Sequence, residues 1–152
     1  MKDIRGTFEE IKGSFESRSH REFKFTRDGN ILFAHGPWFP DFVHKHVGYN
    51  FFTIKGNPVG STYFAQLPGC CGVVVSFHTY LEPGFRHSEY SDLFRGFKEA
   101  IAKHYGFTVM LATTRYDDSR SLRNFEKSNY NRLLKFKNKR STNDVVLGAK
   151  EI

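Results

Sequence analysis

The sequence has few cysteines and no long apolar run, and both absences restrict what the chain can be. Its two cysteines, Cys70 and Cys71, are adjacent, and neighbouring cysteines rarely form an unstrained disulfide. This usage favours a reducing, intracellular setting. No apolar stretch approaches the roughly 18 residues of a membrane span, and the start of the chain lacks the basic-then-apolar order of a secretory signal. We therefore expect a cytoplasmic protein without membrane contact.

Several familiar motifs are missing as well. The sequence has no phosphate-binding P-loop, no dinucleotide fingerprint and no cysteine–histidine arrangement for nucleophilic catalysis. It also has no internal repeat, low-complexity tract or linker. A length of 152 residues fits one core, so we expect a single domain over residues 1–152.

Three histidines lie near one another in the sequence, namely His35, His44 and His46. His44 and His46 would face the same way on a strand, a spacing that can bind a metal ion. No acidic or sulfur partner is obvious beyond Asp41. We therefore expect loop histidines and no metal site.

Aromatic residues and positive charge are abundant. Aromatics make up 16% of the chain, with 17 phenylalanines, which is ample for a packed interior. The net charge is +7, and residues 115–140 hold nine Lys or Arg against three acids. Such a block can be a solvated face, or it can attract phosphate or nucleic acid. For nucleic acid, the candidates in "NYNRLLKFKNKR" are Arg132, Lys135, Lys137, Lys139 and Arg140, although a solvent-facing edge hairpin guarded by lysines has the same pattern.

The spacing of apolar residues predicts the elements of the first half. Phe8, Ile11 and Phe15 recur at helical spacing and predict a helix over residues 7–18. Alternation over residues 21–35, interrupted by Asp28-Gly29, predicts a hairpin. Residues 36–49 contain two prolines and are expected to form a loop with at most a short helix. Residues 50–66 predict two short strands around Gly56-Asn57.

The second half predicts a strand–helix–strand unit followed by a helix and two strands. Residues 72–81 form an apolar run that suggests a strand buried on both faces. The clearest helix covers residues 88–105, a buried strand follows at 107–114, and the next helix begins with Asp117 or Asp118 as its N-cap. The two strands of the unit need a crossover and are expected to be parallel neighbours. "NRLLKFK" and "DVVLGAKEI" close the chain as a hairpin. The fold class is therefore α/β, with a mixed, mostly antiparallel sheet and helices on both faces.

Over about residues 50–152 the order of elements resembles the GNAT acyltransferase superfamily. In that family a long fourth strand ends at a proline, an aromatic and an arginine, which "LEPGFR" supplies here. A later family helix reads Asn-x-x-Ala-x-x-x-Tyr-x-Lys-x-Gly-Phe. "DSRSLRNFEKSNY" matches it position by position, with Asp118 at the Asn, Ser121 at the Ala, Phe125 at the Tyr and Lys127 at the Lys.

The resemblance implies transfer of an acyl group from acetyl-CoA or another acyl-CoA to an amine. Backbone N–H groups of the loop and of the helix N-terminus would hold the pyrophosphate, and the fourth and fifth strands would splay around the thioester. A base on or near the fourth strand and a tyrosine acid on the later helix would move the protons. The residues carried over to acyl-CoA binding are Leu81, Arg86, His87, Ser88, Tyr90, Ser91, Asp118, Ser121 and Phe125.

The sequence departs from the family pattern at the chemical positions. Glu89 and Ser91 stand where the family has small residues in its phosphate loop, and Phe125 stands at the tyrosine. The strand positions that often carry a base are the apolar Val75 and Phe77. Substitutes are His78 as a base and Tyr116 as an acid, although a hydrogen-bonded core histidine and a packed tyrosine fit the same positions.

Two functions are therefore open. The first is a GNAT-like N-acyltransferase, with relocated acid and base groups or with catalysis by positioning. The second is a GNAT-shaped protein without acyl transfer that binds or modifies nucleic acid, or is a structural component, as is seen among basic phage-encoded GNAT-like proteins. In the structural case the protein would be associated with a virion.

Overall fold

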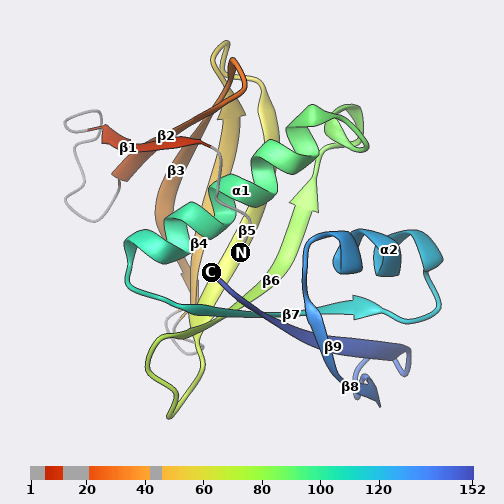
Figure 1. Cartoon of the computed structure of the whole chain (residues 1–152). Coiled ribbons are helices and arrows are strands. Elements are labelled where there is room, and N and C mark those ends of the chain that lie inside the picture. Colours follow the sequence, from red (N-terminus) through yellow and green to blue (C-terminus); the bar gives the residue numbers. More distant parts are fainter. Residues whose placement is uncertain (1–5, 12–20, 42–45) are drawn as a thin grey trace.

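The structure is a computed structural model that describes residues 6–11, 21–41 and 46–152. Its centre is one nine-stranded sheet in the order β1-β2-β3-β4-β5-β6-β7-β9-β8 (Figure 1). Only β6 and β7 pair in parallel; the other neighbours are antiparallel. The elements are β1 (Thr7–Ile11), β2 (Arg21–Arg27), β3 (Asn30–Asp41), β4 (His46–Thr53), β5 (Pro58–Gln66), β6 (Val73–Leu81), the 3-10 helix η1 (Pro83–Phe85), α1 (Glu89–His104), β7 (Val109–Arg115), α2 (Ser119–Lys127), β8 (Asn131–Lys137) and β9 (Asp144–Glu151).

Most of the expected elements are confirmed. Asp28 and Gly29 turn the β2–β3 hairpin with φ angles of 50° and 80°, which suits a tight hairpin. The parallel pairing of β6 with β7 is confirmed, as is the mixed, mostly antiparallel sheet. Cys70 and Cys71 are free and exposed in the β5–β6 connection. None of the helices in the described ranges is long and apolar enough to cross a membrane.

The helix expected over residues 7–18 is wrong where the structure describes it, because Thr7–Ile11 forms the edge strand β1. Phe8 lies opposite Phe25 in the pairing with β2, and its ring stacks on Phe23 at 5.1 Å. Pairing with the β2 edge therefore outweighs the helical spacing of Phe8 and Ile11. Residues 12–18 lie outside the described residues.

The loop expected over residues 36–49 is also wrong, because β3 continues to Asp41 and β4 begins at His46. The pairing of β3 with β4 shifts register between His35 and Trp38, and again between Trp38 and Asp41. Such bulges let a strand contain prolines that cannot donate to the ladder. His44 lies outside the described residues.

The hydrophobic core lies between the sheet and α1. Phe97 of α1 stacks on Phe25 at 5.4 Å, and Phe94 meets Phe51 edge-on at 4.7 Å. Phe25, Phe51 and Phe97 have no exposed surface. Burying such rings stabilises the fold by roughly 2 kcal/mol each. The phenylalanine-rich composition therefore supplies a single aromatic core.

Both described helices lie on the same face of the sheet, so the expectation of helices on both faces does not hold for the described residues (Figure 1). Met110 of β7 belongs to the α1 core and lies opposite Lys150 of β9. Lys150 pairs with Glu99 of α1 and donates to the Ser128 carbonyl at the end of α2, at 2.6 Å. Residues two apart on a strand share a face of the sheet, so Gly148 lies on the same face as Lys150. Gly148 faces Phe125 of α2, which places α2 on the face that α1 covers.

Lys98 of α1 is the one Lys or Arg that is buried among the described residues. Burial lowers the pKa of Lys98 to about 8; Glu99 raises it, and Lys150 and Arg95 lower it further. Below pH 8 the folded protein therefore holds a charge that burial disfavours. Between this folded pKa and the ordinary lysine pKa of 10.5 the unfolded chain binds more protons, so this contribution to stability rises with pH.

We therefore expect Lys98→Met to raise the free energy of unfolding at pH 7 by up to about 3 kcal/mol. The advantage over the wild type should shrink as the pH rises from 8 toward 10. Urea unfolding of both proteins at pH 7 and pH 10 measures it, with the exposed Lys103→Met on the same helix as control. A Lys98→Met protein that is destabilised equally at both pH values would contradict the interpretation.

Candidate functional site

Strands β6 and β7 pair over only three residues and then separate. Val73–Val75 lie beside residues 109–111. Beyond this seam β6 continues to Leu81 beside β5, and β7 continues to Arg115 beside β9. In Figure 1 the two strands leave the seam in clearly different directions. The sheet therefore opens between its two parallel strands, and backbone groups along both inner edges lose their strand partner.

A bulge in β6 accompanies this separation. Tyr63 of β5 lies opposite Phe77, but Ser61 lies opposite Tyr80, so His78 and Thr79 share one place in the ladder. His78 has a φ of 47°, and the Thr79 hydroxyl bonds to that of Thr62 at 2.9 Å. A bulge bends its strand and increases its twist. The bulge at His78 and Thr79 therefore turns the end of β6 away from β7.

The bulge changes the position expected for His78. His78 is exposed rather than buried in the core, and only the first part of β6 contains buried side chains. Its ring packs edge-on against Phe77 at 5.2 Å and Tyr63 at 6.1 Å. His78 is thus available to solvent at the place where the sheet opens.

The N-terminus of α1 lies just beyond the end of β6. Ser88 caps the helix, and its hydroxyl accepts from the Tyr90 N–H at 3.2 Å. Arg86 donates from Nε to the Leu81 carbonyl at 2.7 Å, which holds the loop against the strand end. Ser91 donates to the Ser88 carbonyl at 2.7 Å. These contacts fix the start of a 16-residue helix, which carries partial positive charge.

The N-terminus of α2 lies across from it, after β7. Asp118 is the N-cap, as one of the two predicted residues, and accepts from the Arg120 and Ser121 N–H groups at 3.1 Å each. Hydrogen bonds from Ser121 lower the pKa of Asp118. Arg120 Nη1 lies 3.4 Å from His87 Nε2. The starts of α1 and α2 are therefore in contact, although these two residues are 33 positions apart in the sequence.

The charges around these helix starts have mixed sign. Arg115 donates twice to Asp117, at 3.1 and 2.9 Å, and these bonds lower the pKa of Asp117. Glu89 is exposed in the first turn of α1. Arg86, His87 and Arg120 are also exposed and provide positive or neutral donors at the same place. The acids at α2 are engaged in a cap and an ion pair, so the groups left for an anion are mainly basic.

A packed cluster anchors α2 behind this opening. Phe125 is 8% exposed and stacks on Tyr130 with ring centroids 4.5 Å apart and planes 7° apart. Lys150 Nζ lies 5.3 Å from the Tyr130 ring centroid. Burial raises the pKa of Tyr130. Phe125, at the family's tyrosine position, thus lies in the interior and packs α2 onto β9.

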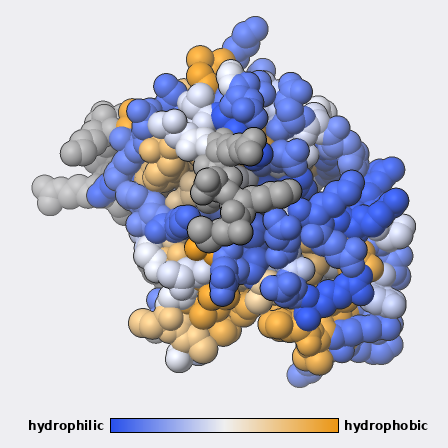
Figure 2. Space-filling model, viewed as in Figure 1, coloured by the Kyte–Doolittle hydropathy of each residue, from blue (hydrophilic) through white to orange (hydrophobic). Residues whose placement is uncertain are grey.

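The remaining candidate residues lie around the opening or away from it. Leu81 and Tyr90 are half-buried, and Tyr90 meets Phe85 edge-on at 5.2 Å. Tyr116 follows β7, is 42% exposed, and has Lys135 Nζ 3.8 Å from its ring centroid. The residues of β8 are exposed along its whole length. Figure 2 shows a hydrophilic surface over α2 and hydrophobic side chains along the lower margin of the molecule. Leu133 and Leu134 of β8 are exposed.

The contact between His87 and Arg120 is the part of the site that sequence reasoning missed. The sequence predicts His87 as a donor in the loop, whereas Arg120 lies in the basic block of residues 115–140 without a role of its own. The signal was the position of Arg120 two residues after the predicted N-cap, which places it in the first turn of α2.

Comparison with known proteins supports the fold. No protein-family model matches the sequence, and no curated protein matches it. Many solved structures match, and GNAT acetyltransferases are among them. A GNAT-family acetyltransferase from Bacillus anthracis has a TM-score of 0.57 at 17% identity, over 68% of this chain and 65% of that one. An IAA acetyltransferase from Bacillus cereus has a TM-score of 0.62 at 12% identity, over 73% and 81%.

A third structure contains a ligand. It is a ribosomal L7/L12 alpha-N-protein acetyltransferase in complex with coenzyme A, with a TM-score of 0.59 at 13% identity over 71% of this chain and 63% of that one. The chain thus spans somewhat less than two thirds of the length of two of these three structures. It has the fold of the GNAT acetyltransferases.

The anchor of α2 gives a prediction at Gly148. A β-carbon at this position would overlap the Phe125 ring, whereas one at Gly84 would meet nothing within 4 Å. We expect Gly148→Ala to lower the free energy of unfolding by about 1–3 kcal/mol through overpacking. Gly84→Ala, the matched control, should change it little. Denaturant unfolding monitors both variants, and equal stabilities would show that α2 does not pack on β9 as described.

Proposed function

We propose that this protein is an N-acyltransferase that transfers an acyl group from acyl-CoA to an amine. The observation that carries the proposal is the separation of β6 and β7 beyond a three-residue seam, with two helix N-termini at the open end. The GNAT fold supports it, since one structural neighbour is in complex with coenzyme A. At 12–17% identity that likeness concerns the fold alone.

The open end suits the pyrophosphate of acyl-CoA. The N–H groups of His87, Ser88 and Glu89 have no acceptor among the described residues. Free N–H groups at a helix N-terminus are donors for phosphate oxygens. Arg120 and Arg86 add guanidinium groups beside them. Glu89 is exposed and would have to point away from the bound phosphates.

The opening would place the thioester between the inner edges of β6 and β7. The amine nitrogen would attack the carbonyl carbon, the C–S bond would break, and the amine proton would end on the departing sulfur. N–H groups on the inner edge of β6 would stabilise the charge that develops on the carbonyl oxygen. His78, exposed at the bulge, is the candidate base, and Tyr116, exposed at the end of β7, is the candidate acid.

Arg120 tests the donor site. We expect Arg120→Ala to weaken acetyl-CoA binding by about tenfold, because a hydrogen bond to a charged group is lost. Isothermal titration of acetyl-CoA and of CoA measures the effect, with Arg140→Ala in the β8–β9 turn as control. Absence of binding by the wild type at millimolar acetyl-CoA would overturn the acyl-CoA proposal.

Nucleic-acid binding is a second candidate, favoured by the exposure of β8 on both faces. Its exposed basic side chains continue into the following turn as Lys139 and Arg140. Exposed Tyr116 and Phe136 provide rings beside them. Arg132 pairs with Glu126, and Lys137 lies 3.9 Å from Asp144, so only part of this charge is available.

If nucleic acid binds here, affinity for a single-stranded oligonucleotide should fall steeply with salt, because phosphate contacts release counterions. Replacing Lys135, Lys139 and Arg140 together by alanine should lower the salt slope by about two to three. Fluorescence anisotropy at several salt concentrations measures it. Absent or salt-insensitive binding would remove this candidate.

A further inference from the structure

A hollow of about 290 Å³ lies at the end of β6 that leads into the α1 loop. It is lined by Asn50 and Phe52 of β4, Gly60 and Ser61 of β5, Tyr80 of β6, and Glu82. Small-molecule sites occupy about 300–1,000 Å³. The volume lies just below that range, so the hollow has room for a small group such as one amino group or a single side chain.

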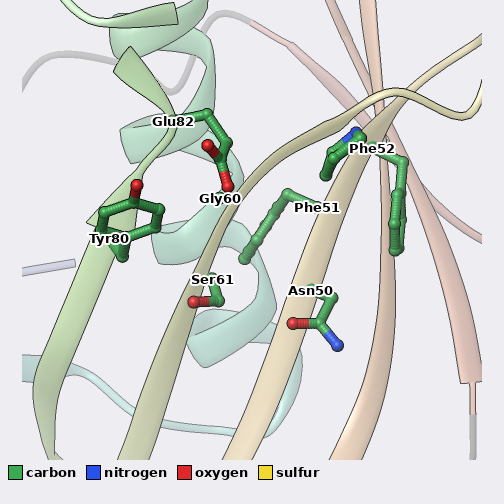
Figure 3. Close-up of a pocket in the computed structure, with 8 residues that line it drawn as sticks. Asn50, Phe51, Phe52, Gly60, Ser61, Tyr80 and Glu82 are labelled. Atoms are coloured by element: carbon green, nitrogen blue, oxygen red, sulfur yellow. The ribbon is translucent and has the colours of Figure 1, made fainter.

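The hollow lies on the face of the sheet opposite α1. Phe51 packs on Phe94 of α1, so its neighbours Asn50 and Phe52 point to the other face. In Figure 3 the Asn50, Ser61 and Tyr80 side chains lie toward the viewer, with the helix behind the strands. The hollow thus lies on the face opposite α1, beside the loop that leads to the N-terminus of that helix.

Gly60 allows the strands to approach closely at this place. A β-carbon there would overlap the Tyr80 carbonyl oxygen. The Glu82 N–H donates to the Val59 carbonyl at 2.7 Å, which fixes the backbone that carries the carboxylate. The position of Glu82 at the rim is therefore set by backbone contacts.

The lining has the chemistry of a cation site. Glu82 is its one charged residue, and it contains no Lys or Arg, although the chain has a net charge of +7. Ser61, Asn50 and Tyr80 add neutral polar groups that can accept from an ammonium. Phe52 adds an aromatic face, which attracts cations, whereas the Tyr80 ring already has the Arg86 guanidinium 5.5 Å from its centroid.

We propose that this hollow binds a protonated amino group of the acceptor, distinct from the amino group that is acylated. That this ligand is the acceptor of an acyl group rests on the proposed function. An ammonium held by Glu82 keeps its proton and has no lone pair for attack on a thioester. The reacting nitrogen is therefore a second one.

The spacing between neighbouring strands is short enough for one acceptor molecule to reach from the hollow to the gap beside β6. The hollow extends over β4, β5 and β6, and the gap that would hold the thioester begins at the other edge of β6. Neighbouring strands are about 5 Å apart. A short aliphatic chain spans that distance, so the structure points to diamines, or longer polyamines, as the acceptor class.

Titration of the full chain with 1,4-diaminobutane, without acyl-CoA, tests the site. We expect binding, weaker binding of 1-aminobutane, and at least about tenfold weaker binding of the diamine to Glu82→Gln. Tyr80→Phe should lose only a few-fold, because the ring is kept. Glu151→Gln, an exposed acid at the end of β9, is the matched control.

Acetyl-CoA titrations of the same variants separate this inference from the proposed function. Diamine binding that depends on Glu82, with unchanged acetyl-CoA affinity, supports both. Acetyl-CoA binding without diamine binding, or diamine binding that is equal in Glu82→Gln, overturns the inference alone. Glu82-dependent diamine binding without any acetyl-CoA binding supports the cation site and overturns acyl transfer.

Discussion

The three-residue seam between β6 and β7 is the constraint on which the rest of the structure depends. Each of these strands has an antiparallel partner on its outer side, β5 for β6 and β9 for β7. Each partner follows its own twist, and twist separates strands that are not tied together. Because only Val73–Val75 tie them, the sheet consists of two antiparallel halves joined at one end.

A sheet joined so weakly needs contacts that hold its halves together from one face. Helix α1 begins at the end of β6 and packs on strands of the larger half, and the chain then returns through β7. Glu99 of α1 pairs with Lys150 of β9, which also donates to Ser128 after α2. This pair is largely buried, at 11% and 15% exposed. A buried pair is weak evidence for net stability, but this one joins three elements, α1, α2 and β9, from both halves.

The sequence predicted those parts of the molecule whose signals are local. Four features depend only on neighbours within a few residues: the helical spacing of apolar residues in α1, the Ser88 cap of α1, the Asp118 cap of α2 and the Asp28-Gly29 turn. The edge strand β1 could not be predicted, because it depends on an open edge of β2. The bulge at His78 has no such local signal, because a non-glycine residue has a positive φ there and the neighbouring Thr62–Thr79 contact joins two strands. The contact of His87 with Arg120 depends on both helix starts at once.

The burial of Phe125 bears on the chemistry that the proposal needs. Phe125 has no proton to give, and its ring is committed to Tyr130 and Gly148, so α2 keeps its position without supplying an acid. A thiol has a pKa of roughly 8.5, far below that of an alcohol or an amine as a leaving group. A thiolate therefore departs near neutral pH with little help from an acid. In the proposed reaction the larger demand is a deprotonated amine held beside the carbonyl, and positioning can supply much of the rate. A cation site that fixes the far end of the acceptor would supply the positioning part of that demand, while deprotonation of the reacting amine would fall to the candidate base His78.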